Sequence, residues 1–334
     1  MKATALVAAS ALAGLAMLLG GPGFMEAWLP VFLLGSGLVA GALGALLLGH
    51  LLDDAWLHPV RPALVAAART APLVALLALP VLTAPEWLYA WAGPGAAGLD
   101  GSQAVWFSSG AFRLRAALIL AIYVLLSWWA VRPDAHPLRT AMGLAVLVPA
   151  ATLAAQDWAL SRDVAWFGSL QGTALFIEQV MAALAGAVLI TLLRQGQPER
   201  EASAGLERAL LTLALVTLWL WFVQFVVVWM ADLPAESGWY LRRGGPWLWL
   251  KAGVILPALV AAIIIAIPPR SGPWRLGAVC ALLLIQHLGH QWWLVRPEAP
   301  HGAASLWLDG LVVPVLAAAW AGWWWSELRR AASA

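Results

Sequence analysis

The sequence predicts an all-α polytopic membrane protein with about ten transmembrane helices. The first observation is composition, because 63% of the 334 residues are hydrophobic and the mean hydropathy is +0.83. The second is charge, because only 11% of the residues are charged, whereas soluble domains average about 25%. The third is spacing. Apolar runs close to the ~20 residues of a membrane helix follow one another, and barrel strands would instead alternate over about ten residues.

Ten apolar stretches, each bounded by proline, glycine or charge, are the predicted spans. They comprise residues 3–20, 29–52, 63–83, 112–131, 140–161, 167–193, 206–231, 247–267, 276–295 and 306–325. The first stretch follows Lys2 and also resembles a signal peptide. No clear small-x-small cleavage site precedes residues 21–23, so we expect a retained helix.

Charge and cysteine content exclude several classes of function. The net charge of +2 is small and the basic residues are spread along the chain, so we expect no nucleic-acid partner. The single cysteine, Cys280, cannot form an intrachain disulfide or hold an iron–sulfur cluster alone. No C-x-x-C-H segment occurs, so no haem is expected to be covalently attached. Any such redox group must therefore belong to another chain.

Basic residues indicate the orientation, because cytoplasmic loops carry an excess of Lys and Arg. With ten spans, the side that holds both termini carries twelve Lys and Arg residues and the other side carries seven. Both termini are therefore predicted to be cytoplasmic. Many of the 23 tryptophans fall at predicted span ends, where indole rings prefer the headgroup boundary. An aromatic belt explains most of them, and the alternative for a few is a quinone pocket.

Four polar side chains at membrane depth form a candidate proton relay: Glu178, Gln224, His287 and His290. Ionisable groups in a membrane are costly, so each needs a reason. The two histidines are three residues apart and share a helix face. The predicted spans place Glu178 and His287 at similar depth near the midplane of one bundle, with Gln224 and His290 nearer the outer face. The alternative is a structural hydrogen-bonded network. We expect no metal site, because a third strong ligand is missing, and no haem b, because no two histidines on different spans share a depth.

A second group lies at the predicted outer face, where a quinol headgroup would bind: Glu86, Arg113, Asp157 and Trp158. Asp157 would accept a proton from quinol there, and Arg113 and Arg115 would pair with it. The alternative is an interfacial ion pair, worth about 1 kcal/mol or less when solvated.

Several short segments together resemble a known family. They are YAWA at 89–92, DWALS at 157–161, WFGS at 166–169, QFVVVW at 224–229, LPAE at 233–236, WYLRR at 239–243 and WWLVRP at 292–297. In this order, and at these places relative to the spans, the chain from about Trp28 to Pro297 resembles the NrfD/polysulfide-reductase-type membrane subunits. Within that family it is similar to the ActF-type subunit of alternative complex III, a quinol:cytochrome c (or other acceptor) oxidoreductase.

The resemblance implies two four-helix bundles, at 29–161 and 162–297, with flanking helices in 1–28 and 298–334. It also implies a subunit that binds quinol, or supports the subunit that does, with proton transfer as a further expectation. Quinone or quinol is the expected non-covalent cofactor. Multihaem cytochrome c, iron–sulfur and other membrane subunits are the implied partners, in a bacterial cytoplasmic membrane. One departure is His290-Gln291, where the branch has a more acidic pattern. The alternative functions are a secondary transporter and a purely structural scaffold.

Overall fold

The computed structural model describes residues 21–52, 54–93, 99, 101–129, 132, 136–166, 168, 170–267, 272–299 and 306–331. In this part of the chain every regular element is a helix, and nine helices are long and apolar enough to cross a membrane. The prediction of an all-α polytopic membrane protein is therefore confirmed. The predicted first span, 3–20, lies outside the described residues.

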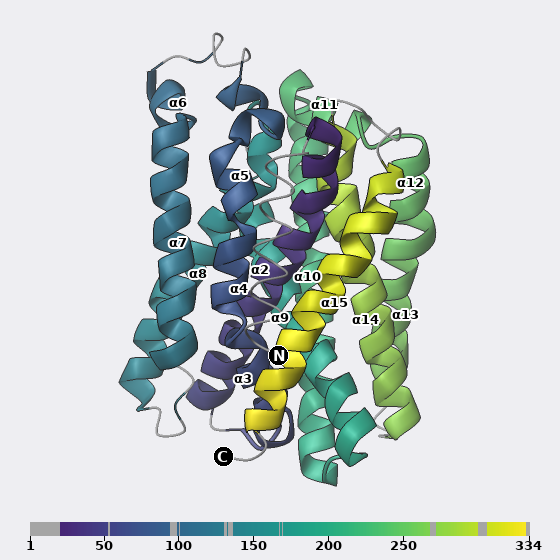
Figure 1. The fold of residues 1–334 in the computed structure, drawn as a ribbon. Coiled ribbons are helices and arrows are strands. Elements are labelled where there is room, and N and C mark those ends of the chain that lie inside the picture. The colour runs from purple at the N-terminus through teal and green to yellow at the C-terminus, as the bar shows by residue number, and fades with distance from the viewer. Residues whose placement is uncertain are drawn as a thin grey trace.

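Successive membrane-spanning segments of the chain run in opposite directions (Figure 1). The first group comprises α2 (Pro22–Leu52), α3 (Leu57–Ala68), α4 (Ala71–Leu77), α5 (Leu79–Thr83), α6 (Gly101–Trp106), α7 (Ser109–Trp129) and α8 (Pro137–Trp158). The second comprises α9 (Gln171–Gln195), α10 (Arg200–Ala231), α11 (Pro234–Leu241), α12 (Pro246–Leu250), α13 (Leu256–Ala266) and α14 (Pro273–Val295), and α15 (Leu306–Ala331) follows. We call the end of the bundle that carries α6 and α11 the upper face, and the opposite end, where α3 begins, the lower face.

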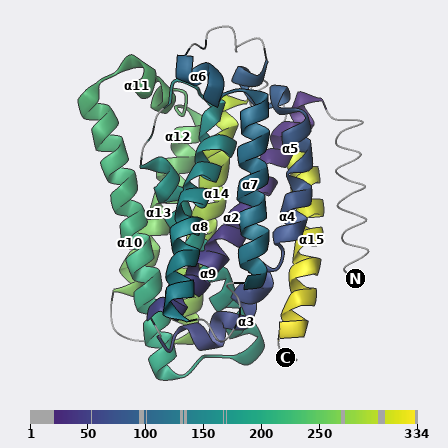
Figure 2. The same cartoon turned by 90° about the vertical axis from the view of Figure 1, so that its left-hand side faces the viewer.

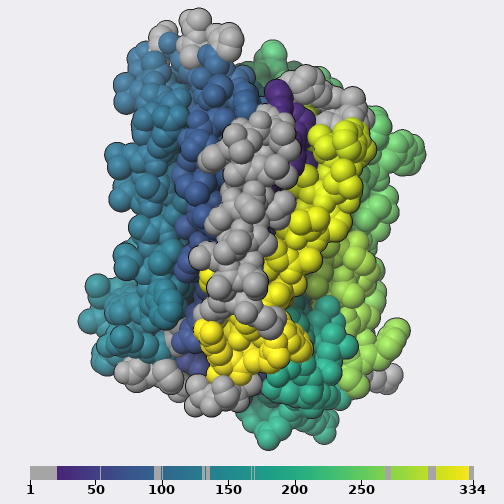
Figure 3. Space-filling view, in the orientation of Figure 1, coloured from purple at the N-terminus to yellow at the C-terminus, as the bar shows by residue number. Residues whose placement is uncertain are grey.

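The two groups meet where α2 packs against α9. Helices α10 and α15 lie on opposite sides of the bundle in the view of Figure 2. Helix α15 crosses the surface of the molecule and packs on α2 and α3 (Figure 3). It runs from the upper to the lower face, as α2 and α9 do.

Helix α2 begins at Pro22, so residues 22–28 belong to it and the predicted start at 29 was too late. Proline suits a first helical turn, because its missing N–H needs no partner there. The added segment contains a charged residue, Glu26. Glu26 is fully buried in an ion pair with Arg162, so the charge is tolerated inside the protein.

Glycines set the distance between α2 and α9. A Cβ atom on Gly41 would lie 2.0 Å from the carbonyl oxygen of Gln179, and one on Gly44 would lie 2.7 Å from the side chain of Val180. Small residues at such spacing let membrane helices approach closely. This contact fixes the position of the α9 segment that carries Glu178, which is next to Gln179.

Two of the spans are interrupted. The span that contains α3, α4 and α5 breaks before Pro72 and Pro80, each of which lies in the first turn of the following helix. Between α12 and α13, residues Lys251–Ile255 form a π turn. Pro149 does not interrupt its span, because it lies inside the continuous helix α8.

Candidate functional site

The carboxylate of Glu178 is the centre of a buried polar cluster. Its Oε1 atom is 2.8 Å from Nδ1 of His287 and accepts a hydrogen bond from Nε2 of Gln286 at 3.0 Å. Its Oε2 atom is 2.6 Å from Nδ1 of His290. Glu178, Gln286 and His290 have no exposed surface, and His287 is 6% exposed. We call these four side chains the Glu178 cluster.

The cluster follows from the spacing of polar residues on α14. Residues 286 and 290 are one turn apart and 287 is adjacent, so all three side chains point toward the neighbouring α9. Three of the four residues predicted for the relay are thus brought together. Gln286 was missed, although its place four residues before His290 was the available signal.

Gln224 is the fourth predicted member and stands apart from the cluster. It is buried on α10, but among the described side chains no hydrogen bond joins it to Glu178 or to the histidines. The α10 residue that reaches the cluster is Trp221, whose ring centroid lies 4.3 Å from that of His290.

The depth of the cluster also differs from the prediction. Glu178 is the eighth residue of α9, because that helix begins at Gln171 and not at residue 167. At about 1.5 Å per residue it lies roughly 10 Å from the upper end of the helix. The cluster therefore lies in the upper half of the bundle, above the midplane.

The charge of Glu178 decides where protons sit in the cluster. An ionised carboxylate can only accept hydrogen bonds, so with Glu178 ionised Nδ1 of each histidine donates to it. A neutral imidazole that donates from Nδ1 carries its lone pair on Nε2. Each histidine therefore presents a basic nitrogen on the side opposite Glu178, and the carboxylate stabilises the cation that forms when that nitrogen gains a proton.

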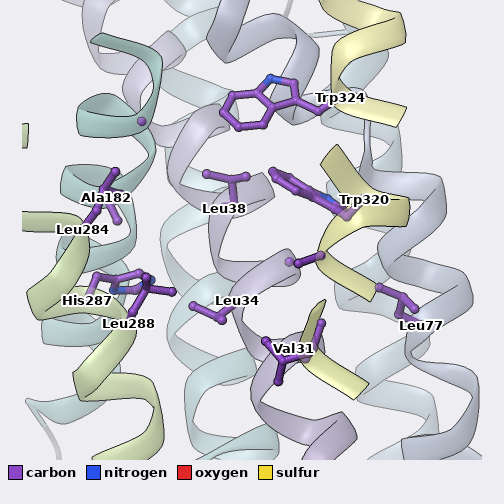
Figure 4. Close-up of a pocket in the computed structure, with 14 residues that line it drawn as sticks. Val31, Leu34, Leu38, Leu77, Ala182, Leu284, His287, Leu288, Trp320 and Trp324 are labelled. Carbon is purple, nitrogen blue, oxygen red and sulfur yellow. The ribbon is translucent and has the colours of Figure 1, made fainter. Parts of the chain in front are cut away.

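His287 also lines an apolar cavity of about 270 Å³ (Figure 4). The lining residues are Val31, Leu34, Gly35, Leu38, Leu77, Ala182, Gly186, Leu284, His287, Leu288, Val313, Ala317, Trp320 and Trp324. Of these described residues, His287 is the only ionisable one. The indole N–H groups of Trp320 and Trp324 are occupied by Thr70 and by the carbonyl of Ala63. The cavity thus combines apolar walls with one basic side chain.

The group predicted to bind a quinol headgroup is arranged differently. Asp157 is buried and forms a two-point ion pair with Arg115, at 2.6 and 3.1 Å. Arg113 instead donates to the carbonyl of Leu82. The prediction that Arg113 pairs with Asp157 was therefore wrong, whereas the predicted partner Arg115 does pair with it.

The other two predicted members of that group differ in exposure. Glu86 is exposed in a short 3-10 turn after α5. Trp158 is buried against Phe32, with ring centroids 4.9 Å apart. Because Asp157 already has a two-point cationic partner, this region resembles a structural ion pair more than a proton acceptor.

A network of four buried charges at the upper face was not predicted. Arg162 donates to Glu26 at 2.7 Å, and Arg296 donates to Asp309 at 2.6 and 3.1 Å. Arg296 also lies 3.9 Å from Glu26, which joins the two pairs. The network ties the start of α2 and the α8–α9 connection to the end of α14 and the start of α15. The sequence feature that could have indicated this network is the position of its four charged residues at or near predicted span ends.

Comparison with known proteins adds no identification: no protein-family model and no curated protein matches the chain. In the described part of the chain, no group of three His, Cys, Asp or Glu side chains is arranged to hold a metal ion. The Glu178 cluster and the adjacent cavity are the features of the described structure that bear on function.

Proposed function

We propose that the chain is a membrane subunit of a respiratory quinol-oxidising complex of the alternative complex III type, in a bacterial cytoplasmic membrane. The Glu178 cluster takes up protons from a quinol in the neighbouring cavity. One observation carries the proposal: His287 lies in the cavity wall and is hydrogen-bonded to Glu178. The resemblance to NrfD-type subunits supplies the redox partners, namely multihaem cytochrome c and iron–sulfur chains.

The chemistry matches the groups present. Oxidation of a quinol releases protons as well as electrons, and its hydroxyl protons need a base within hydrogen-bond reach. The Nε2 lone pair of His287 is such a base, and Glu178 stabilises the resulting imidazolium. The apolar walls suit the hydrocarbon part of a quinol. The electrons pass to the partner chains.

The grouping implied by the resemblance does not fit a transporter with inverted repeats. If α2 and α9 open the two groups, both run in the same direction, whereas inverted repeats would run oppositely. The interrupted helices also fall at different places, since α3–α5 is the second span of its group and α12–α13 the third. A purely structural scaffold is the remaining alternative, and the following experiment separates it.

Replacing Glu178 with glutamine is expected to lower quinol-oxidising turnover of the assembled complex by about 100-fold or more, because the base loses its carboxylate partner. Glutamine keeps the shape, so the complex should still assemble, and turnover is expressed per assembled complex. The measurement is quinol oxidation and proton release by the purified complex, with co-purifying chains identified by mass spectrometry. Glu201→Gln, the same change at an exposed residue of α10, is the control. Full turnover in Glu178→Gln would reject the relay, and a scaffold would instead show low yield in Glu178→Leu.

The orientation gives a separate prediction. Both termini are proposed to be cytoplasmic, so a fluorescent protein fused after Ala334 should fluoresce and a phosphatase fused there should be inactive. The reverse pattern would place the lower face outside the cell.

A further inference from the structure

Lys251 is a lysine inside a membrane-spanning segment, and the Glu178 cluster does not include it. It is the first residue of the π turn between α12 and α13, and it is half-buried. A lysine at this depth needs a partner, because an unpaired charge in a membrane is costly. In the sequence it is one of the seven Lys and Arg residues on the predicted outer side.

Two tryptophan rings hold the ammonium group. Nζ of Lys251 lies 3.2 Å from the ring centroid of Trp221 on α10 and 4.5 Å from that of Trp293 on α14. Cations are attracted to the face of an indole ring, and most strongly where water is excluded. The π turn contributes to this placement, since such turns change the direction in which side chains leave a helix and are frequent at functional sites.

The same two tryptophans contact the Glu178 cluster. The ring of His290 lies 4.3 Å from Trp221 and 5.5 Å from Trp293, so it packs against both rings that hold Lys251. Lys251 also interacts electrostatically with Glu178 and with His290. The ammonium group and the cluster therefore share one aromatic boundary.

The charged groups around Lys251 come from three segments. Helix α9 contributes Glu178, α14 contributes His287 and His290, and the segment after α11 contributes Arg243. Burial lowers the pKa of Arg243 to about 10, against the effect of Glu298, so Arg243 remains a cation at neutral pH. Its hydrogen bonds to Glu298 and to two backbone carbonyls occupy that cation at the upper face. Lys251 is then the cation available to Glu178.

Charge balance gives Lys251 a role. With Glu178 ionised and both histidines neutral, the cluster would carry one negative charge, which a protonated Lys251 would balance. When a proton enters the cluster, the negative charge of the cluster is neutralised, so the attraction between the cluster and the Lys251 ammonium group weakens. A buried charge is tolerated only with such compensation.

We infer that Lys251 is a positioning residue that sets the proton occupancy of the Glu178 cluster, held in place by the π turn and the Trp221–Trp293 pair. This role rests on the proposed function for its link to quinol. Its electrostatic part concerns the protein alone.

The test compares Lys251→Met, which removes the charge and keeps the length, with Lys251→Arg, which keeps the charge. The readout is the infrared band of a protonated carboxylic acid in the purified chain, followed against pH and assigned to Glu178 by its loss in Glu178→Gln. In Lys251→Met the band is expected to appear at a pH higher by about one unit or more, because a nearby cation favours the ionised carboxylate. Lys251→Arg is expected to restore the native profile.

The outcomes separate this role from the proposed function. An unchanged titration in Lys251→Met, or no Glu178 band in either protein, overturns the inference. Lys251→Gln gives the same comparison if Lys251→Met does not fold. A shifted titration combined with full turnover of Glu178→Gln keeps the electrostatic role and rejects the quinol function. Equal losses of turnover in Lys251→Met and Lys251→Arg would also count against the electrostatic role of Lys251, because the charge of the side chain would then not matter.

Discussion

Replacing Gly41 with alanine is expected to lower the yield of folded protein sharply. The added Cβ atom would lie 2.0 Å from the carbonyl oxygen and 2.4 Å from the carbonyl carbon of Gln179. These are backbone atoms of α9, so no side-chain rotation relieves the clash and the two helices must separate. Overpacking typically costs roughly 1–3 kcal/mol, and a collision with backbone should exceed that range. The measurement is the yield and the unfolding midpoint of the purified protein in detergent.

Two further alanine substitutions provide a graded comparison. A Cβ atom on Gly37 would meet the side chain of Gln179 at 2.9 Å, and that flexible side chain can move, so Gly37→Ala should be milder. Gly110→Ala on α7 meets nothing within 4 Å and should be neutral or slightly stabilising. Equal stability of the three variants would show that the close approach of α2 and α9 does not hold the bundle together. Separation of these helices should also displace Glu178 and lower turnover.

The sequence predicted the parts of the fold that depend on hydrophobic length. Apolar stretches near 20 residues are governed by bilayer thickness, so the nine described spans lie close to their predicted places. Helix ends were less predictable. The end of a helix depends on which polar groups find partners, as Glu26 does with Arg162 at the start of α2. The predicted depth of Glu178 was too far from the upper end of α9 for the same reason, because the start of that helix could not be located from the sequence.

The candidate site was predictable only in part. The spacing of His287 and His290 placed both on one helix face, and their contact with Glu178 follows from packing of α9 on α14. Which side chains fill the space between helices depends on tertiary contacts. Lys251 and His290 meet at the rings of Trp221 and Trp293, and Trp221 comes from a third helix. Arg115, and not Arg113, pairs with Asp157 because of helix rotation that a span prediction does not specify.

Glu26→Gln is expected to destabilise the protein by about 3–5 kcal/mol, the usual cost of removing one partner from a buried ion pair. The four described side chains of the network, Glu26, Arg162, Arg296 and Asp309, comprise two carboxylates and two guanidinium groups, so their net charge is zero. Glutamine has nearly the same shape as glutamate but leaves one uncompensated positive charge. Arg162 is the most affected, because among the described residues its ion pair is with Glu26 alone and its side chain is 1% exposed.

The same network permits a decisive control. Adding Arg162→Met to Glu26→Gln removes the uncompensated cation and restores neutrality, so the double variant should be more stable than the sum of the single effects predicts. Glu86→Gln, the same substitution at an exposed residue, should change stability by about 0.5 kcal/mol or less. The measurement is the unfolding midpoint of each variant in one detergent at one pH. Equal midpoints for Glu26→Gln and Glu86→Gln would mean that the network contributes little to stability. Strictly additive effects of the two network substitutions would mean that Glu26 and Arg162 do not act as a pair.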